Sequence, residues 1–239
     1  MDFIKLLKEE KLTLIVSLPE NNLELAKAAL EAGADVIKVH INVEHRASKT
    51  HFKSLKEELP VLKEMVTLCK LYKKSIGIVA GGHEKIPMEE IEGIIKIGFQ
   101  FISIYDKHMN PEVLSKDLYK MVAIDNEYNL DYVNAINSLP IDVLECSIMA
   151  PETYGQPLTV REIIQYKAIR NTTDKPMVIP SQRAITPEQC IILQQIGVNA
   201  VMIGAVVTGK SSSSIYKATS DFRKVIDTFN NKEKDKCIH

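Results

Sequence analysis

Short β-branched runs alternate with longer amphipathic segments along this chain, and this alternation constrains its fold more than any other feature. Each run has the length and composition of a buried strand. The eight runs span 13–18, 36–41, 75–80, 99–106, 119–125, 142–148, 176–180 and 200–204. The segments between them carry apolar residues at helical spacing, although 110–118 has only a weak helical pattern. Strict alternation predicts an α/β protein with a parallel sheet, and eight such units in 239 residues predict a closed (β/α)8 TIM barrel.

The chain shows no linker and no shift in composition that would divide it into domains. We therefore expect a single barrel domain over residues 1–229. A short helix at 2–10 precedes the first strand and is expected to cover the bottom of the barrel. The segment 230–239 is rich in charge, and we expect it to be a frayed tail.

Charge and cysteine usage limit the partners and the compartment that we expect. The formal net charge is −1 and tryptophan is absent, so there is no electrostatic basis for a nucleic-acid or membrane partner. No apolar stretch approaches the roughly 18 residues of a membrane span. The four cysteines are scattered without a CxxC pair, and acids and lysines interrupt the first apolar run. We expect a cytoplasmic protein with free thiols and no signal peptide, and we leave a homodimer open.

The active sites of (β/α)8 barrels lie at the carboxyl ends of the strands. The run 36–41 places Lys38 and His40 on one face, because side chains two apart in a strand point the same way. The opposite face is apolar, so we expect both side chains to face the barrel interior. A lysine buried there needs a partner. It is either half of a structural ion pair or a group held for charge or proton work.

Acidic residues on three further strands are the other candidate catalytic groups. Glu145 lies within 142–148, whereas Asp106 and Asp125 close their strands. For Asp106, a solvated strand end is an equal alternative. A lysine and carboxylates that meet at one mouth fit proton abstraction next to a carbonyl, with a cation stabilising the enolate. Schiff-base formation by Lys38 is a second reading of the same residues.

The last two strands indicate a phosphate site. Barrels of this class often hold phosphate on the loops after strands seven and eight. The seventh strand delivers Ser181 and Arg183, and Thr186 is expected to be the N-cap of the next helix. The eighth delivers Gly204 and Ala205, whose small side chains would let backbone N–H groups approach an anion.

The long segment 42–54 is rich in cations, and it either closes over an anionic substrate or is a solvated loop of mixed charge. Histidines are frequent near the expected mouth, but no two have the i, i+4 spacing of a zinc helix. We therefore expect no metal site and no cofactor.

At these residues the chain resembles the ribulose-phosphate-binding barrels, and most closely the N-acetylmannosamine-6-phosphate 2-epimerase family. The runs 15–17 and 33–39 resemble the first two strands of that family, with Lys38 where the family tends to have arginine. Asp106 matches an aspartate at the end of its fourth strand. Arg183 with Thr186-Pro187 is similar to the family's Arg-x-x-Thr-Pro, and 203–208 is similar to its Gly-x-x-x-Thr.

This chain departs from the pattern of the family at two places. The family has a catalytic lysine directly after its third strand, where this chain reads Ala80-Gly81, and its glycine-rich turn after strand seven is Ser181-Gln182 here. The resemblance implies a barrel enzyme that acts on a small phosphorylated sugar or related metabolite, with epimerisation or isomerisation as the expected reaction. An aldolase- or decarboxylase-type lyase and a non-catalytic barrel that binds a phosphorylated metabolite are the alternatives.

Overall fold

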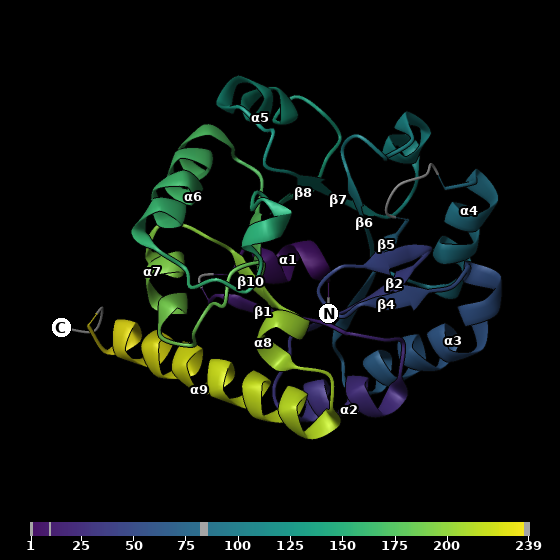
Figure 1. The fold of residues 1–239 in the computed structure, drawn as a ribbon, viewed down its shortest axis with the longest axis horizontal. Helices are drawn as coiled ribbons and strands as arrows, with labels where there is room; N and C mark the ends of the chain where they lie inside the picture. Colours follow the sequence, from purple (N-terminus) through teal and green to yellow (C-terminus); the bar gives the residue numbers. More distant parts are fainter. Residues whose placement is uncertain (1, 10, 82–85, 237–239) are drawn as a thin grey trace.

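The computed structural model describes residues 2–9, 11–81 and 86–236, with side chains up to residue 231, and its strands form a closed barrel (Figure 1). Eight parallel strands pair in the ring order β1-β10-β9-β8-β7-β6-β5-β2. They are β1 (Thr13–Ser17), β2 (Val36–Ile41), β5 (Ser75–Ala80), β6 (Phe101–Tyr105), β7 (Tyr119–Ile124), β8 (Val143–Cys146), β9 (Met177–Pro180) and β10 (Ala200–Ile203). The predicted α/β fold, a (β/α)8 TIM barrel, is confirmed.

Helices surround the barrel and cover the outer face of its strands (Figure 1). They are α2 (Leu23–Glu31), α3 (Leu55–Leu71), α4 (Met88–Ile97), α5 (Leu130–Ile136), α6 (Val160–Thr172), α7 (Gln189–Gln195) and α9 (Ser212–Lys236). The short helix α8 (Ala205–Thr208) instead begins directly after β10, at the carboxyl end of that strand. Two short 3₁₀ turns, η1 (Pro111–Ser115) and η2 (Pro151–Thr153), complete the loops after β6 and β8. The weak helical pattern at 110–118 thus corresponds to η1, which has Pro111 at its start.

The alternation of side chains along β2 decides which groups reach the barrel interior. Ile37, Val39 and Ile41 are fully buried and belong to the large apolar cluster between the strands and the helices. Lys38 and His40 point the other way, into the barrel, and each is only 3% exposed. The predicted orientation of these two polar side chains is therefore confirmed.

The helix α1 (Phe3–Leu7) covers the bottom of the barrel. Phe3 is fully buried and stacks on Phe101 of β6, with 4.0 Å between ring centroids. Together with Leu7 they belong to a second apolar cluster, which fills the lower barrel. Asp2 caps the helix by accepting a hydrogen bond from the Lys5 N–H. This packed floor leaves the opposite end of the barrel for a binding site.

Two elements differ from the sequence analysis. The segment 42–54 contains an antiparallel hairpin, β3 (Val43–His45) and β4 (Thr50–Phe52), which pairs only with itself. Three-residue strands with charged residues give almost no periodic signal, so the sequence predicted only a loop. Secondly, α9 continues through Lys236, into the segment 230–239 that we expected to be frayed. Residues 237–239 lie outside the described part of the chain.

Gly77 of β5 provides a test of the packing at the barrel floor. A Cβ at this position would lie 2.1 Å from the ring of Phe101, and that ring is also stacked on Phe3. We expect Gly77→Ala to lower the free energy of unfolding by about 3 kcal/mol, because the ring has no room to move. Chemical denaturation measures the effect.

Gly204→Ala is the matched control. Its φ of −135° is extended backbone, and the added methyl would meet its nearest neighbours at 3.6 Å, an ordinary contact. We expect a change within about 0.5 kcal/mol. Equal stability of the two variants would contradict the close approach at Gly77.

Candidate active site

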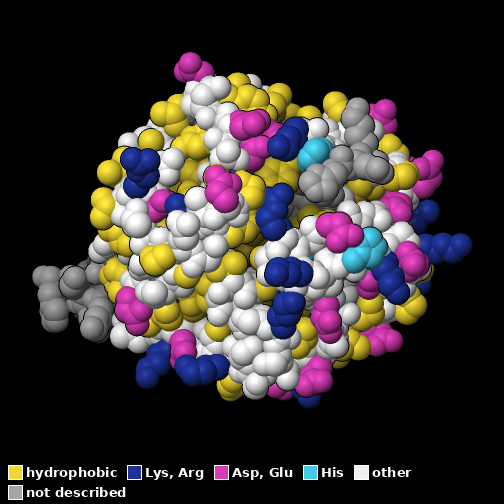
Figure 2. Space-filling model, viewed as in Figure 1, with side chains coloured by type: hydrophobic (Ala, Val, Ile, Leu, Met, Phe, Trp, Pro, Cys, Tyr) yellow, Lys and Arg dark blue, Asp and Glu magenta, His cyan; other side chains and the backbone are white. Residues whose placement is uncertain are grey.

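A cavity of about 200 Å³ opens at the carboxyl ends of the barrel strands. Lys and Arg side chains gather near the centre of the face that Figure 2 shows. Polar side chains from several strand ends line the cavity, among them Ser17, Lys38, Ser103, Glu145 and Ser181. This is the end at which (β/α)8 barrels hold their active sites.

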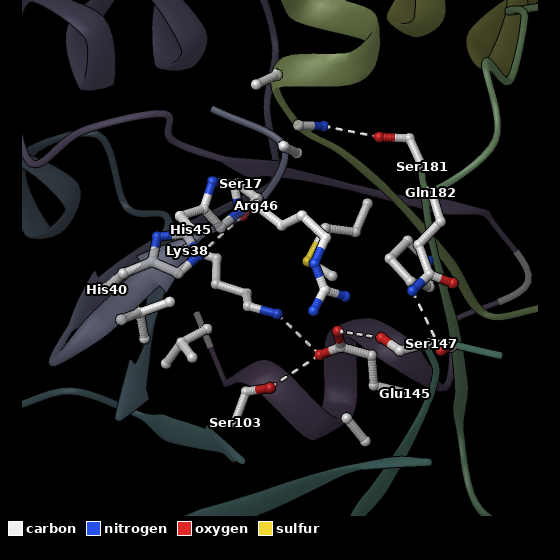
Figure 3. Close-up of a pocket in the computed structure, with 18 of the residues that line it drawn as sticks. Ser17, Lys38, His40, His45, Arg46, Ser103, Glu145, Ser147, Ser181 and Gln182 are labelled. Atoms are coloured by element: carbon white, nitrogen blue, oxygen red, sulfur yellow. Dashed lines mark hydrogen bonds and ion pairs between the residues drawn. The ribbon is translucent and has the colours of Figure 1, made fainter. Parts of the chain in front are cut away.

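A buried ion pair crosses the interior at this level (Figure 3). The Lys38 Nζ lies 2.8 Å from Glu145 Oε2, and the two side chains are 4% and 7% exposed. Their strands, β2 and β8, lie opposite each other in the ring, with three strands between them on either side. The pair therefore spans the barrel, and it brings together two of the predicted catalytic residues.

Two hydroxyl groups complete the surroundings of Glu145. Ser103 of β6 donates to Oε2 at 2.8 Å, and Ser147 donates to Oε1 at 3.0 Å. Burial alone would raise the pKa of Glu145, but the charge and hydrogen bond of Lys38, with the two hydroxyls, lower it below its usual value. Glu145 is thus held as a carboxylate that faces an ammonium group across the cavity.

Two histidines lie beside this pair. His40 Nε2 is 3.5 Å from the Ser17 hydroxyl, and its ring lies 4.7 Å from that of His45 on the hairpin. Burial lowers the pKa of His40 well below its ordinary value, and the nearby His45 and Lys38 lower it further. Burial, with Lys38 and Lys210, lowers the pKa of His45 to about 4. Both imidazoles are therefore neutral near pH 7.

The loops after β9 and β10 meet at the predicted phosphate site. Ser181 Oγ accepts a hydrogen bond of 2.9 Å from the Gly204 N–H, so this N–H is already used within the protein. The Ser181 hydroxyl proton remains available to a ligand. Ala205 and Val206 begin α8, where the first N–H groups have no partner within the helix. Ser181, Gly204 and Ala205 all line the cavity.

Arg183 lies elsewhere, and its predicted place at the phosphate site is corrected. Its guanidinium pairs with Glu162 at 2.8 Å and donates to the Thr153 carbonyl and the Gln156 side chain. Glu162 belongs to the capping box that starts α6 and is 3% exposed, so it needs a cation beside it. Arg183 therefore contacts the start of α6 and does not line the cavity. Nor is Thr186 an N-cap, because α7 begins at Gln189.

Asp106 and Asp125 do not meet the Lys38–Glu145 pair, which corrects the expected convergence of these acids on one mouth. They line a second depression. Asp125 pairs with Lys107 at 2.6 Å, and Asp106 accepts a hydrogen bond from the hydroxyl of Tyr132 at 2.8 Å. Both acids follow the last residue of their strands, where the alternation of the strand no longer fixes the direction of a side chain.

The sequence pattern places Gln182 in the turn after strand seven but assigns neither Gln182 nor Ser103 a role in the site. Gln182 accepts a hydrogen bond from the Met149 N–H and donates to the Ser147 carbonyl and the Tyr154 hydroxyl, so it joins the loops after β8 and β9. Ser103 had a usable signal, because it is a small polar residue on the inward face of an apolar strand. Gln182 had none, since its partners are far away in sequence. Within the described ranges, no cluster of three or more His, Cys, Asp or Glu residues could hold a metal ion.

The hairpin β3–β4 covers part of the mouth. Arg46, in its turn, lines the cavity, and its guanidinium carbon lies 5.9 Å from the ring centroid of Tyr154. Tyr154 follows η2, so this contact connects the loop after β2 with the loop after β8. The cation-rich loop predicted from the sequence thus has side chains in the site.

Solved structures similar to this chain are (β/α)8 barrels of low sequence identity. Thiamine phosphate pyrophosphorylase from Pyrococcus furiosus is 16% identical, with a TM-score of 0.65 over 92% of this chain and 97% of that chain. The tryptophan synthase A-subunit from Pyrococcus furiosus is 12% identical, with a TM-score of 0.67 over 91% and 99%. A native KDPGal structure is 16% identical, with a TM-score of 0.65 over 95% and 98%.

These similarities establish the fold of this chain, and they do not establish its activity or its substrate. No protein-family model and no curated protein sequence matches the chain. The resemblance to the epimerase family therefore stays a prediction. Among the helices of the described residues, none has the length and apolar character needed to cross a bilayer.

The strength of the buried pair can be measured by a double-mutant cycle. We expect Lys38→Met and Glu145→Gln each to lower the free energy of unfolding by about 3–5 kcal/mol, because each leaves a buried polar partner unmatched. The free energy of unfolding should fall clearly less in the double variant than the sum of the losses in the two single variants. The exposed pair Lys217–Asp221, with the same kind of contact at 2.7 Å, is the control and should couple by less than about 0.5 kcal/mol. A coupling in the buried pair no larger than in this control would contradict its proposed strength.

The neutral state of His45 predicts a pH dependence of stability. The unfolded chain binds a proton on this imidazole near pH 6.5, whereas the folded chain does so only near pH 4. The contribution of His45 is therefore fully present above pH 6.5 and is lost as the pH falls towards 4. We expect His45→Asn to flatten this part of the stability curve, measured as urea midpoints from pH 7 to 4. Parallel curves for the two proteins would show that His45 is not held neutral.

Proposed function

We propose that this chain is an enzyme that acts on a small phosphorylated sugar or related metabolite, and that it epimerises or isomerises its substrate by proton abstraction next to a carbonyl. The observation that carries the proposal is the buried Lys38–Glu145 pair on the wall of the cavity. A cation and a carboxylate at hydrogen-bond distance, shielded from water, are the two groups that this reaction requires.

Each partner of the pair would have its own part in the reaction. The Lys38 ammonium would donate a hydrogen bond to the carbonyl oxygen and stabilise the negative charge that develops there. Glu145 would accept the proton from the adjacent carbon. Lys38 and two hydroxyls lower its pKa, which makes it a weak base without substrate. A carbonyl that draws the Lys38 hydrogen bond to itself would leave Glu145 a stronger base.

The phosphate group would lie at the loops after β9 and β10. The Ser181 hydroxyl and the first N–H groups of α8 are the donors there. Gly204 would serve by having no side chain on the cavity wall. Among the structural neighbours, thiamine phosphate pyrophosphorylase is named for a phosphorylated compound, which adds modest support.

Carbon–carbon bond cleavage is the second candidate, favoured by one observation. Lys38 is an amine buried in the cavity, and a carboxylate lies 2.8 Å away to take and return protons. Such an amine, once deprotonated, attacks a carbonyl and releases water, which gives a Schiff base that accepts the electrons of the broken bond. Neither reaction requires a metal ion or a cofactor.

Hydrogen exchange tests the proposed proton transfer. Purified protein is incubated in D₂O with ribulose 5-phosphate, fructose 6-phosphate or N-acetylmannosamine 6-phosphate, and NMR follows loss of the C–H signal next to the carbonyl. We expect exchange with at least one of these in the wild type, and a loss of at least about 100-fold in Lys38→Met and in Glu145→Gln. Asp125→Asn, which lies in the other depression, is the control and should exchange at the wild-type rate.

The other outcomes separate the alternatives. Binding without exchange would support the non-catalytic barrel. A covalent adduct at Lys38 after borohydride reduction, found by mass spectrometry, would instead support the lyase. Failure of every phosphorylated compound and of inorganic phosphate to bind would overturn the proposal altogether.

A further inference from the structure

Among the cavity-lining residues that the structure describes, the charged side chains do not all have a partner of opposite charge. Lys38 and Glu145 neutralise each other. Glu44 also lines the cavity, but its side chain is 69% exposed and contacts His51 across the hairpin. Its carboxylate is therefore largely solvated and already paired. Of the described residues on the cavity wall, the remaining charged side chain is Arg46.

Arg46 has no acidic partner in the described part of the chain. No carboxylate oxygen there lies within 4.0 Å of its guanidinium, whereas Arg183 and Arg223 both form ion pairs. Its contact with the Tyr154 ring leaves the N–H donors at the edge of the guanidinium free. Those donors are arranged as a planar fork that matches a carboxylate.

The place of Arg46 separates it from the proposed phosphate site. Figure 3 shows the Arg46 side chain extending into the cavity, with its guanidinium apart from Ser181 and pointing, in this view, towards the Lys38–Glu145 pair. Tyr154, beneath it, is fixed by a hydrogen bond of 2.5 Å from Gln182. A single phosphate at Ser181 would therefore not use the Arg46 donors.

We propose that the ligand of this cavity carries two acidic groups, and that Arg46 is the specificity residue that binds the second of them, a carboxylate close to the reacting carbon. The inference rests on the proposed function, since it places the phosphate at Ser181 and Ala205. It narrows the substrate class from phosphorylated sugars in general to phosphorylated sugar acids and related phosphorylated carboxylic acids. The guanidinium fork would hold the carboxylate through two parallel N–H donors, while the hairpin that carries Arg46 covers the mouth.

Binding of a matched pair of compounds tests this inference. Erythronate 4-phosphate and erythritol 4-phosphate have the same carbon chain and the same phosphate, but only the first has a carboxylate at the far end. Calorimetry should show that the wild type binds the acid at least about tenfold more tightly, because a charge-assisted pair of hydrogen bonds is added. In Arg46→Gln this preference should fall to within twofold, with the affinity for erythritol 4-phosphate unchanged.

Two further variants serve as controls. Lys49→Asn removes a positive charge from the same hairpin turn at a residue that does not line the cavity, and asparagine tolerates its φ of 55°. It should keep the preference for the acid. Arg46→Lys keeps the charge but lacks the planar fork of N–H donors, so this variant should keep only part of the preference for the acid.

Other results would overturn the inference in distinguishable ways. Equal binding of the two compounds by the wild type would refute the carboxylate site and leave the phosphate site intact. An equal loss for both compounds in Arg46→Gln would mean that Arg46 contacts the phosphate. If neither compound binds, and inorganic phosphate does not bind either, the proposed function fails together with this inference.

Discussion

The structure depends on one electrostatic constraint, a lysine and a glutamate that face each other across the inside of a barrel. Lys38 and Glu145 come from opposite strands and are almost completely buried, so each offsets part of the cost of burying the other. The hydroxyls of Ser103 and Ser147 add one hydrogen bond to each oxygen of the carboxylate. Polar groups therefore replace the apolar side chains that fill the lower barrel, and the cavity begins where this change occurs.

Around this pair, loops on two sides of the cavity form its mouth. Gln182 joins the loops after β8 and β9 through three hydrogen bonds, and Ser181 joins β9 to β10. These contacts fix the side of the cavity on which we place the phosphate. The opposite side is formed by the hairpin after β2, which reaches across to Tyr154. A rigid wall and a separate cover are suited to holding a small ligand away from water.

Much of this arrangement was predictable from local patterns. The eight strand runs predicted the barrel. The spacing of Lys38 and His40 predicted that both face inward, because they alternate with the apolar residues of the outward face and so give the strand a clear period of two. Glu145 on an inward position made it a natural partner for the lysine. The positions of Ser181, Gly204 and Ala205 on the cavity wall likewise agree with the sequence pattern of the last two strands.

The sequence does not predict the directions of side chains that lie beyond the ends of the strands. Arg183 turns to Glu162, and Asp125 turns to Lys107, because each finds an opposite charge in its own neighbourhood. Such pairings depend on tertiary distances that no spacing encodes. The same holds for Arg46, whose position follows from a hairpin of two three-residue strands.

The pairing of the hairpin affects how the mouth of the cavity can open. Its two strands bond to each other and form no ladder with the barrel, so lifting it breaks no hydrogen bond of the eight-stranded ring. Opening at the mouth and loss of the whole fold are thus separate events with separate energies. We expect opening of the hairpin to cost packing, chiefly that of the buried Phe52 on His40, while the amides of the surrounding strands stay protected from solvent.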